Sequence, residues 1–234
     1  MTHSFLPPLG VNLFRIAQIW ALFTPEQRKR VLTARKEVKL KRNAVVYHQG
    51  DTPEFLYYVK HGIVQVERED RPERSHTLRF IAKGGIFGYR AGLARQKYLS
   101  TAFAFEACTI VCIPIKLVIQ LLHEIPALTL MLVEDLAIEL GRSDCRIVGL
   151  TQKHLRGRVA DTLLFLEENF GMRKTDNTLQ IQLTRQKFAN LANMTTANAI
   201  RTLTALANEG VIELDGREIR ILDIEAIHEI SSKG

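Results

Sequence analysis

Cysteine is scarce in this sequence, with three residues in 234: Cys108, Cys112 and Cys145. Their spacing forms neither a disulfide framework nor the paired pattern of a zinc site, so we expect a reducing, cytoplasmic setting. No apolar run reaches the roughly 20 residues that a membrane-spanning helix needs. The opening residues MTHSFLPPLG lack the apolar core of a secretory signal. These absences argue against a secreted or membrane protein.

Patterns of catalysis are missing as well. We find no Ser/His/Asp arrangement, no metal-ligand spacing and no Walker motif. We therefore expect no enzyme, no catalytic residue and no metal site. With 46% hydrophobic residues, the chain can bury a sizeable core, and its length fits two domains.

Acidic side chains are in the minority, with 25 Asp and Glu against 32 Lys and Arg. The net charge of +7 favours an anionic partner. Residues 151–234, however, hold 11 basic and 11 acidic side chains, so the surplus lies in residues 1–150. It includes a basic run from Arg28 to Arg42, which we interpret as a solvated face rather than a second nucleic-acid site.

Residues 183–221 carry the most specific pattern, LTRQKFANLANMTTANAIRTLTALANEGVIELDGREIRI. Thr184 and Thr195 are N-cap candidates for two helices, and Asn193 can take the left-handed conformation of the turn between them. Two short strands around an Asp215-Gly216 turn follow. This order predicts a winged helix-turn-helix, which places its second helix in the DNA major groove. The alternative is an ordinary helical hairpin with a packed β-ribbon.

The N-terminal residues of the second helix are the ones that reach base edges. Arginine can donate to guanine, asparagine can pair with adenine, and a threonine methyl can touch a thymine methyl. The predicted DNA-binding residues are Thr184, Arg185, Gln186, Thr195, Thr196, Ala197, Asn198 and Arg201.

From about Val38 to Pro114, short segments rich in β-branched and aromatic residues alternate with glycines, which predicts a barrel or jelly roll. Apolar residues then follow a heptad spacing, which predicts a helix for pairing with a second copy. A helix lying on the barrel is the alternative. The heptad positions are Val133, Leu136, Leu140, Ser143, Ile147 and Leu150.

A further helix is expected from near His154 to Gly171. We therefore predict three parts: a sensor domain at residues 1–125, a dimerisation helix at 126–152 and a DNA-binding domain at 153–234.

In this order, the chain resembles the CRP/FNR family of bacterial transcription regulators. The segments FGYRAGL (Phe87–Leu93), LRGRVADTLLFL (Leu155–Leu166) and 183–214 carry the resemblance. It implies an α+β fold with a double-stranded β-helix sensor of the cyclic-nucleotide-binding kind. It also implies a homodimer that binds a palindromic operator under control of an effector. The implied partners are double-stranded DNA, a second copy of the chain and RNA polymerase, with no membrane.

The sequence departs from the family at the effector site. Cyclic-nucleotide binders carry FGE followed by Arg-Ser or Arg-Ala, whereas Tyr89 replaces the glutamate and Leu99 the arginine here. Each lost contact is worth roughly 1.5–3 kcal/mol, so cyclic AMP held in the usual way is not expected. Arg90, Arg95 and Lys97 are expected in one loop, where they either serve another anion or point to solvent. The candidate effector-pocket residues are Gly88, Tyr89, Arg90, Leu99, Ser100, Thr101, Ser143 and Asp144.

Other sensors of the family leave different traces. No cysteine precedes Cys108, so the N-terminal iron–sulfur cluster of the FNR branch is not expected. Haem stays open, because His48, His61, His76 and His154 are available as axial ligands.

The predicted recognition helix also departs from the family pattern. Well-studied members place Arg-Glu at the positions matching Thr196 and Ala197, and only the arginine matching Arg201 is kept. A regulatory module acting through protein contacts is the competing function.

Overall fold

The computed structural model describes the backbone of residues 16–71 and 74–234. The opening decapeptide, from which we expect no secretory signal, lies outside this part, as do the side chains of Cys145 and Leu150. The chain forms two compact units that divide between residues 139 and 140, and each is treated separately below.

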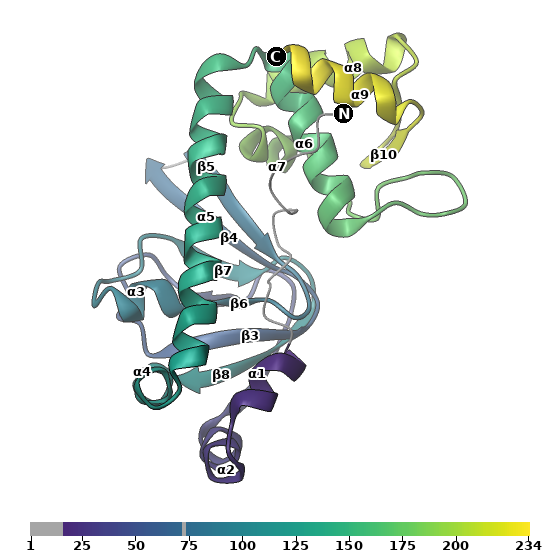
Figure 1. The fold of residues 1–234 in the computed structure, drawn as a ribbon. Helices are drawn as coiled ribbons and strands as arrows, with labels where there is room; N and C mark the ends of the chain where they lie inside the picture. The colour runs from purple at the N-terminus through teal and green to yellow at the C-terminus, as the bar shows by residue number, and fades with distance from the viewer. Residues whose placement is uncertain (1–15, 72–73) are drawn as a thin grey trace. The chain divides into compact units, whose positions relative to one another are not determined.

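The first unit contains two four-stranded sheets, ordered β1-β8-β3-β6 and β2-β7-β4-β5, in which all pairs are antiparallel (Figure 1). Apart from the pair of β4 and β5, neighbours in a sheet are distant in sequence, as expected for the predicted jelly roll, and the α+β fold class is confirmed. The strands are β1 (Lys36–Leu40), β2 (Val45–Tyr47), β3 (Phe55–His61), β4 (Val64–Arg71), β5 (Arg74–Ile81), β6 (Ile86–Phe87), β7 (Thr101–Ala104) and β8 (Cys108–Pro114).

Side-chain alternation along the strands builds two apolar layers in this unit. On β3, Tyr57 and Val59 join a core between the sheets, whereas Leu56 on the opposite face packs with helical residues. Tyr47 stacks on Tyr98 with ring centroids 3.6 Å apart, and Tyr57 stacks on Phe87 at 5.0 Å. Aromatic rings therefore occupy much of the interior between the sheets.

Four helices accompany the sheets: α1 (Ile16–Leu22), α2 (Pro25–Ala34), α3 (Tyr89–Leu93) and α4 (Ile115–Glu124). Thr24 starts α2 with a capping box, in which its hydroxyl accepts from the Gln27 amide and the Gln27 side chain accepts from the Thr24 amide. The sequence analysis placed Arg90 in a loop, which is wrong, because it lies in α3. Five residues are too few for a periodic pattern to predict this helix.

The long helix α5 spans Pro126–Gln152. Three of the predicted heptad residues are largely exposed in the single chain: Val133 by 53%, Leu140 by 64% and Ile147 by 60%. Leu136 instead packs within its own chain against the cluster that contains Leu132. Among the described residues, no single helix is long and apolar enough to cross a membrane. The pair Ile115–Glu124 and Pro126–Gly141 reaches that apolarity together but is bent by 114°.

The second unit consists of helices that pack on one another and a small two-stranded hairpin (Figure 1). His154 is the N-cap of α6, and Gly171 ends this helix with a positive φ, as predicted. The hairpin loop is Gly216-Arg217 rather than Asp215-Gly216, because Asp215 is still paired with Glu218. The elements are α6 (Leu155–Phe170), α7 (Arg185–Leu191), α8 (Thr196–Asn208), β9 (Ile212–Asp215), β10 (Glu218–Ile221) and α9 (Ile224–Lys233).

Candidate DNA interface and effector region

Helices α7 and α8 have the local signals that the sequence predicts. The Thr184 hydroxyl accepts from the Lys187 amide and the Thr195 hydroxyl accepts from the Asn198 amide, both at 3.2 Å. Asn193 connects the helices with a φ of 51°. Phe188 and Leu203, fully buried, belong to the apolar faces of the two helices. Together they form a helix-turn-helix.

The N-terminal face of α8 is polar and accessible. Ala197 and Arg201 are exposed, and Thr196 and Asn198 are partly exposed. The Arg201 guanidinium donates to the Asn198 side-chain oxygen at 2.5 Å. The Thr196 hydroxyl donates to the Gln186 side-chain oxygen of α7 at 2.6 Å. Four of the predicted DNA-binding residues therefore form two hydrogen-bonded pairs, Arg201 with Asn198 and Thr196 with Gln186.

Arg185 has a second role that the sequence analysis missed. Its Nη2 donates to the carbonyl of Gly216 at 2.8 Å, which ties the first turn of α7 to the wing hairpin. Its Nη1 is buried without a hydrogen-bond partner, and burial lowers the pKa of the guanidinium. Arginine nevertheless stays charged in proteins, so Arg185 keeps a positive charge between helix and wing.

Helix α6 contacts both the turn between α7 and α8 and the C-terminal end of α8. Arg158 Nη1 donates to the carbonyl of Asn193, in the turn between α7 and α8, at 3.0 Å. Arg156 makes a two-pronged ion pair with Glu209 at the end of α8, and this hydrogen bonding raises the pKa of Arg156. The turn and the far end of α8 are thus both held by one helix.

The structure adds two residues to the predicted interface. Ile200 on α8 is 47% exposed, although it lies beside the buried Ala199. Its place off the buried stripe of Ala199, Leu203 and Leu206 could have identified it from the sequence. Arg217 is exposed at the tip of the wing. Its position after Gly216 in a hairpin turn was a usable signal as well.

Tyr89, at the position of the family's effector glutamate, is turned into the protein. It is only 2% exposed, and its hydroxyl donates to Asp135 Oδ2 on α5 at 2.9 Å. Burial raises the pKa of Tyr89, and the nearby Asp135 carboxylate raises it further. Gly88 before it has a φ of 81°, and a Cβ there would lie 2.6 Å from the Tyr57 ring. The residues that would hold a ribose hydroxyl are thus used in packing.

The remaining effector candidates do not restore the missing contacts. Leu99 is 62% exposed and carries no charge, and Arg90 is exposed. Ser100 is partly exposed and hydrogen-bonds the buried Tyr47. The uncharged Thr101 hydroxyl accepts from the Gln49 amide. Ser143 and Asp144 lie on the part of α5 in the other compact unit, where both are exposed. The donor set therefore does not fit a cyclic nucleotide bound in the family's usual way.

The candidate redox and haem ligands are placed as follows. Cys108 and Cys112 are buried, and burial raises the pKa of both thiols, as expected for structural cysteines. Of the four candidate haem ligands, His48, His61 and His154 are exposed and His76 is partly exposed. None of the four is a buried axial ligand, and haem remains a prediction.

Comparisons with known proteins agree with this geometry. A model of the cyclic nucleotide-binding domain matches residues 37–124, and a model of the Crp-like helix-turn-helix domain matches residues 157–230. A cAMP-activated global transcriptional regulator CRP from Pasteurella multocida is 28% identical over 183 residues, which covers 77% of this chain and 87% of that protein. A global nitrogen regulator from Nostoc is 25% identical, with 77% and 82% covered.

Solved structures show the same fold. The transcriptional regulator TTHA1359 of the CRP/FNR family, from Thermus thermophilus, superimposes with a TM-score of 0.72 at 25% identity and covers 84% of this chain and 98% of its own. FixK2 from Bradyrhizobium japonicum gives a TM-score of 0.74 at 18% identity, with 84% and 96% covered.

Proposed function

Because the chain belongs to the CRP/FNR family of transcription regulators and carries its helix-turn-helix DNA-binding domain, we propose that it acts as a homodimer on a palindromic operator. The accessible polar face at the start of α8, with Ala197 and Arg201 exposed, is the observation that carries this proposal. Polar and cationic groups at the start of a recognition helix are those that reach base edges in the major groove.

The exposed residues of α5 support the homodimer. Val133, Leu140 and Ile147 are spaced by seven residues on one helix, and each is more than half exposed. Pairing two such helices would remove this row from water, which is the main driving force of helix association. Two-fold symmetry would then match two half-sites about 34–36 Å apart, one turn of DNA.

Within each half-site, we assign different roles to the elements. Arg201 and Asn198 would contact base edges, and Ile200 would contact a thymine methyl. Thr184 and Gln186 at the start of α7, and Arg217 at the wing tip, would contact phosphates. Arg185 would hold the wing hairpin in place, because its guanidinium is already bonded to the Gly216 carbonyl. RNA polymerase is the proposed protein partner at the promoter.

The effector is proposed to be something other than cyclic AMP. Tyr89 donates its hydroxyl proton to Asp135, so it offers no carboxylate to a ribose, and the exposed Leu99 offers no cation to a phosphate. Isothermal titration with cyclic AMP checks this directly. We expect no saturable heat of binding, and saturable binding of cyclic AMP to the native chain would contradict the proposal.

The test of DNA binding starts with selection of bound fragments from a random DNA library. We expect a two-fold symmetric consensus, bound by a dimer of 26.6 kDa chains. Fluorescence anisotropy should then show affinity falling by about tenfold or more between 50 and 200 mM salt, since phosphate contacts release counterions. Recovery of no consensus, together with binding that ignores salt, would contradict the proposal.

A regulator that acts through protein contacts is the second candidate. The observation in its favour is charge: residues 151–234 hold 11 basic and 11 acidic side chains, so this part of the chain carries no net charge that would attract DNA. An apolar protein interface would be largely insensitive to salt. The salt series above therefore distinguishes the two functions.

A further inference from the structure

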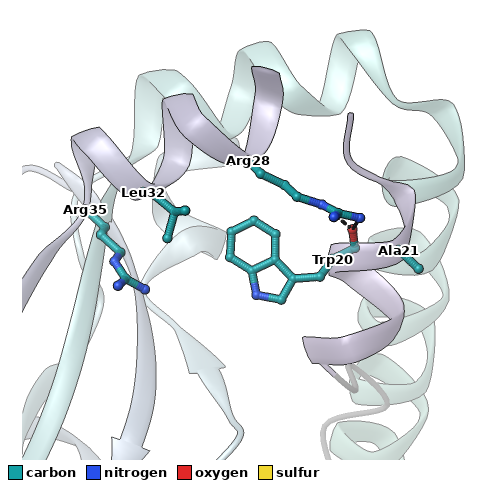
Figure 2. Close-up of a pocket in the computed structure, with 5 residues that line it drawn as sticks. All are labelled: Trp20, Ala21, Arg28, Leu32 and Arg35. Carbon is teal, nitrogen blue, oxygen red and sulfur yellow. Dashed lines mark hydrogen bonds between the residues drawn. The ribbon is translucent and has the colours of Figure 1, made fainter. Parts of the chain in front are cut away.

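The basic run of residues 28–42 has a structural place that its sequence does not reveal. It holds eight basic side chains and one acidic one. Arg30 is paired with Glu124 at 2.8 Å. Arg28 and Arg35 instead line an open hollow together with Trp20, Ala21 and Leu32 (Figure 2). The guanidinium of Arg28 is fixed there, since it donates to the Trp20 carbonyl at 2.6 and 3.1 Å.

A second, more apolar cavity of about 320 Å³ adjoins this hollow, with Trp20 and Arg35 shared by both. It lies between the outer face of the β1-β8-β3-β6 sheet and the helices α1, α2, α4 and α5. Its apolar lining includes Trp20, Leu56, Tyr58, Val111, Leu121 and Leu132.

This cavity is distinct from the interior between the two sheets. Consecutive residues of a strand face opposite sides of a sheet. On β3, Leu56 and Tyr58 line the cavity, whereas Tyr57 and Val59 belong to the core between the sheets. The cavity is therefore not the cyclic-nucleotide pocket that the family resemblance implies.

The charged residues of the cavity favour an anion at its mouth. Three charged side chains line it: Arg35, Glu37 and Lys60. Lys60 is bonded to both carboxylate oxygens of Glu37, at 2.9 and 3.1 Å. This pair is neutral, so Arg35 supplies the excess positive charge. Arg35 is exposed and makes no side-chain hydrogen bond to any other residue that the structure describes.

We propose that this cavity binds a small amphipathic carboxylic acid, with its apolar tail against Trp20 and the outer sheet face and its carboxylate on Arg35. The cavity volume is at the lower end of the roughly 300–1,000 Å³ of small-molecule sites, which suits a medium-length acyl chain or an aryl group. A guanidinium binds a carboxylate with two parallel hydrogen bonds. Binding at this site does not depend on the proposed DNA-binding mode.

The chain provides its own probe, because Trp20 is its single tryptophan. Titration of the full chain with sodium decanoate, followed by tryptophan fluorescence, should give a saturable change. Decan-1-ol has the same tail without the charge and should bind about tenfold more weakly, as expected for the loss of one exposed charge-assisted contact. Both titrations are made below the concentration at which the ligand aggregates.

Two variants and one control separate the contribution of the Arg35 charge from that of the cavity. Arg35→Gln should remove the preference for decanoate over decanol, whereas Lys41→Gln, an exposed position of the same basic run that does not line the cavity, should keep it. Val111→Phe should fill part of the cavity and weaken both ligands by about tenfold. Circular dichroism and thermal melting show that each variant is folded.

Three results would overturn the proposal. The first is no saturable change with decanoate in the native chain. The second is equal binding of decanoate and decanol, which would remove the role of Arg35. The third is unchanged binding in a folded Val111→Phe variant, which would place the ligand elsewhere. In support, decanoate should also raise the melting temperature of the native chain but not that of Val111→Phe.

Discussion

Arg201 is the residue on which sequence-specific binding most depends. It is exposed on α8 and held by the Asn198 side chain, so its guanidinium is oriented before DNA arrives. We predict that Arg201→Ala abolishes specific binding, with a loss of at least 1–3 kcal/mol for a two-pronged base contact. Anisotropy titrations with the selected operator and with unrelated DNA measure this loss.

Arg217→Ala is the matched control for this prediction. The wing tip is exposed and lies away from α8 in sequence, and a phosphate contact carries no base information. This variant should weaken operator and unrelated DNA alike and reduce the salt slope by about one. If Arg201→Ala keeps the native oligomeric state and still prefers the operator over unrelated DNA as strongly as the native chain, Arg201 does not contact bases.

Tyr89 should contribute to stability through Asp135. Asp135 is only 5% exposed, and the Tyr89 hydroxyl donates to its carboxylate across 46 positions of sequence. Tyr89→Phe removes this donor and should lower the free energy of unfolding by about 1–3 kcal/mol in urea denaturation. Tyr58→Phe is the control, because Tyr58 is partly exposed and should lose far less. Equal losses in both variants would show that the hydroxyl bond is not what matters.

At this scale, the sequence predicts what is local. The N-caps Thr184 and Thr195 and the left-handed Asn193 follow from residue type and neighbours within four positions. The bonds from Arg185 to Gly216 and from Tyr89 to Asp135 join distant segments, so no local pattern encodes them. Only the folded chain shows that both side chains are used inside the protein.

Among the elements, α5 provides a direct test of the homodimer. Leu140→Glu places a charge in the exposed row at its most exposed member. Two such charges would face each other in a paired helix, so we expect monomers at concentrations where the native chain is dimeric. Gln152→Glu adds the same charge at an exposed position outside the heptad row and should leave the dimer intact. Light scattering after gel filtration measures both, and a dimeric Leu140→Glu would contradict this seam.

The elements also show where periodicity misleads. A strict heptad pattern places Leu136 and Leu140 in the same dimer seam, but Leu136 packs beside Leu132 within its own chain. The helix has to serve its own domain and the proposed partner at once, and the spacing of 3.6 residues per turn cannot separate these faces. Helix α3 was not predicted for a different reason. It has five residues, which are too few to show a helical period of hydrophobic residues.

For the whole sensor unit, the buried tyrosines predict loss of stability in alkali. Burial raises the pKa of Tyr47 and of Tyr57 to about 12 from an ordinary value near 10. The unfolded chain therefore releases these protons near pH 10, while the folded chain keeps them until about pH 12. Stability from both groups is complete below pH 10 and declines as the pH rises toward 12, by roughly 3 kcal/mol for Tyr47 alone.

Thermal melts between pH 9 and 12, together with the ultraviolet absorbance of phenolate, measure this decline. The melting temperature should fall through the window, and Tyr47→Phe should flatten the fall. Titration of all five tyrosines near pH 10 in a protein that is still folded would contradict the assignment. The sequence predicts a barrel here, but the stacking of Tyr47 on Tyr98 depends on strands that are distant along the chain.

The order of barrel, long helix and winged helix follows from the sequence, because each has its own period and the winged segment has caps and turns at fixed spacing. The apolar cavity beside Trp20 could not be predicted from the sequence. It needs α1, α2, α4 and α5 against one sheet face, and no spacing of residues predicts a void between them.

The bond from Arg185 to the Gly216 carbonyl sets a limit on which operators the protein can accept. With the hairpin fastened to the first turn of α7, the proposed base contacts of α8 and the proposed phosphate contact of the wing tip keep a constant separation. A half-site lengthened by one base pair between these contacts would be displaced by about 3.4 Å along the DNA axis, and the hairpin could not swing to follow it. Operators of this protein should therefore vary in base sequence at the flanks but not in length.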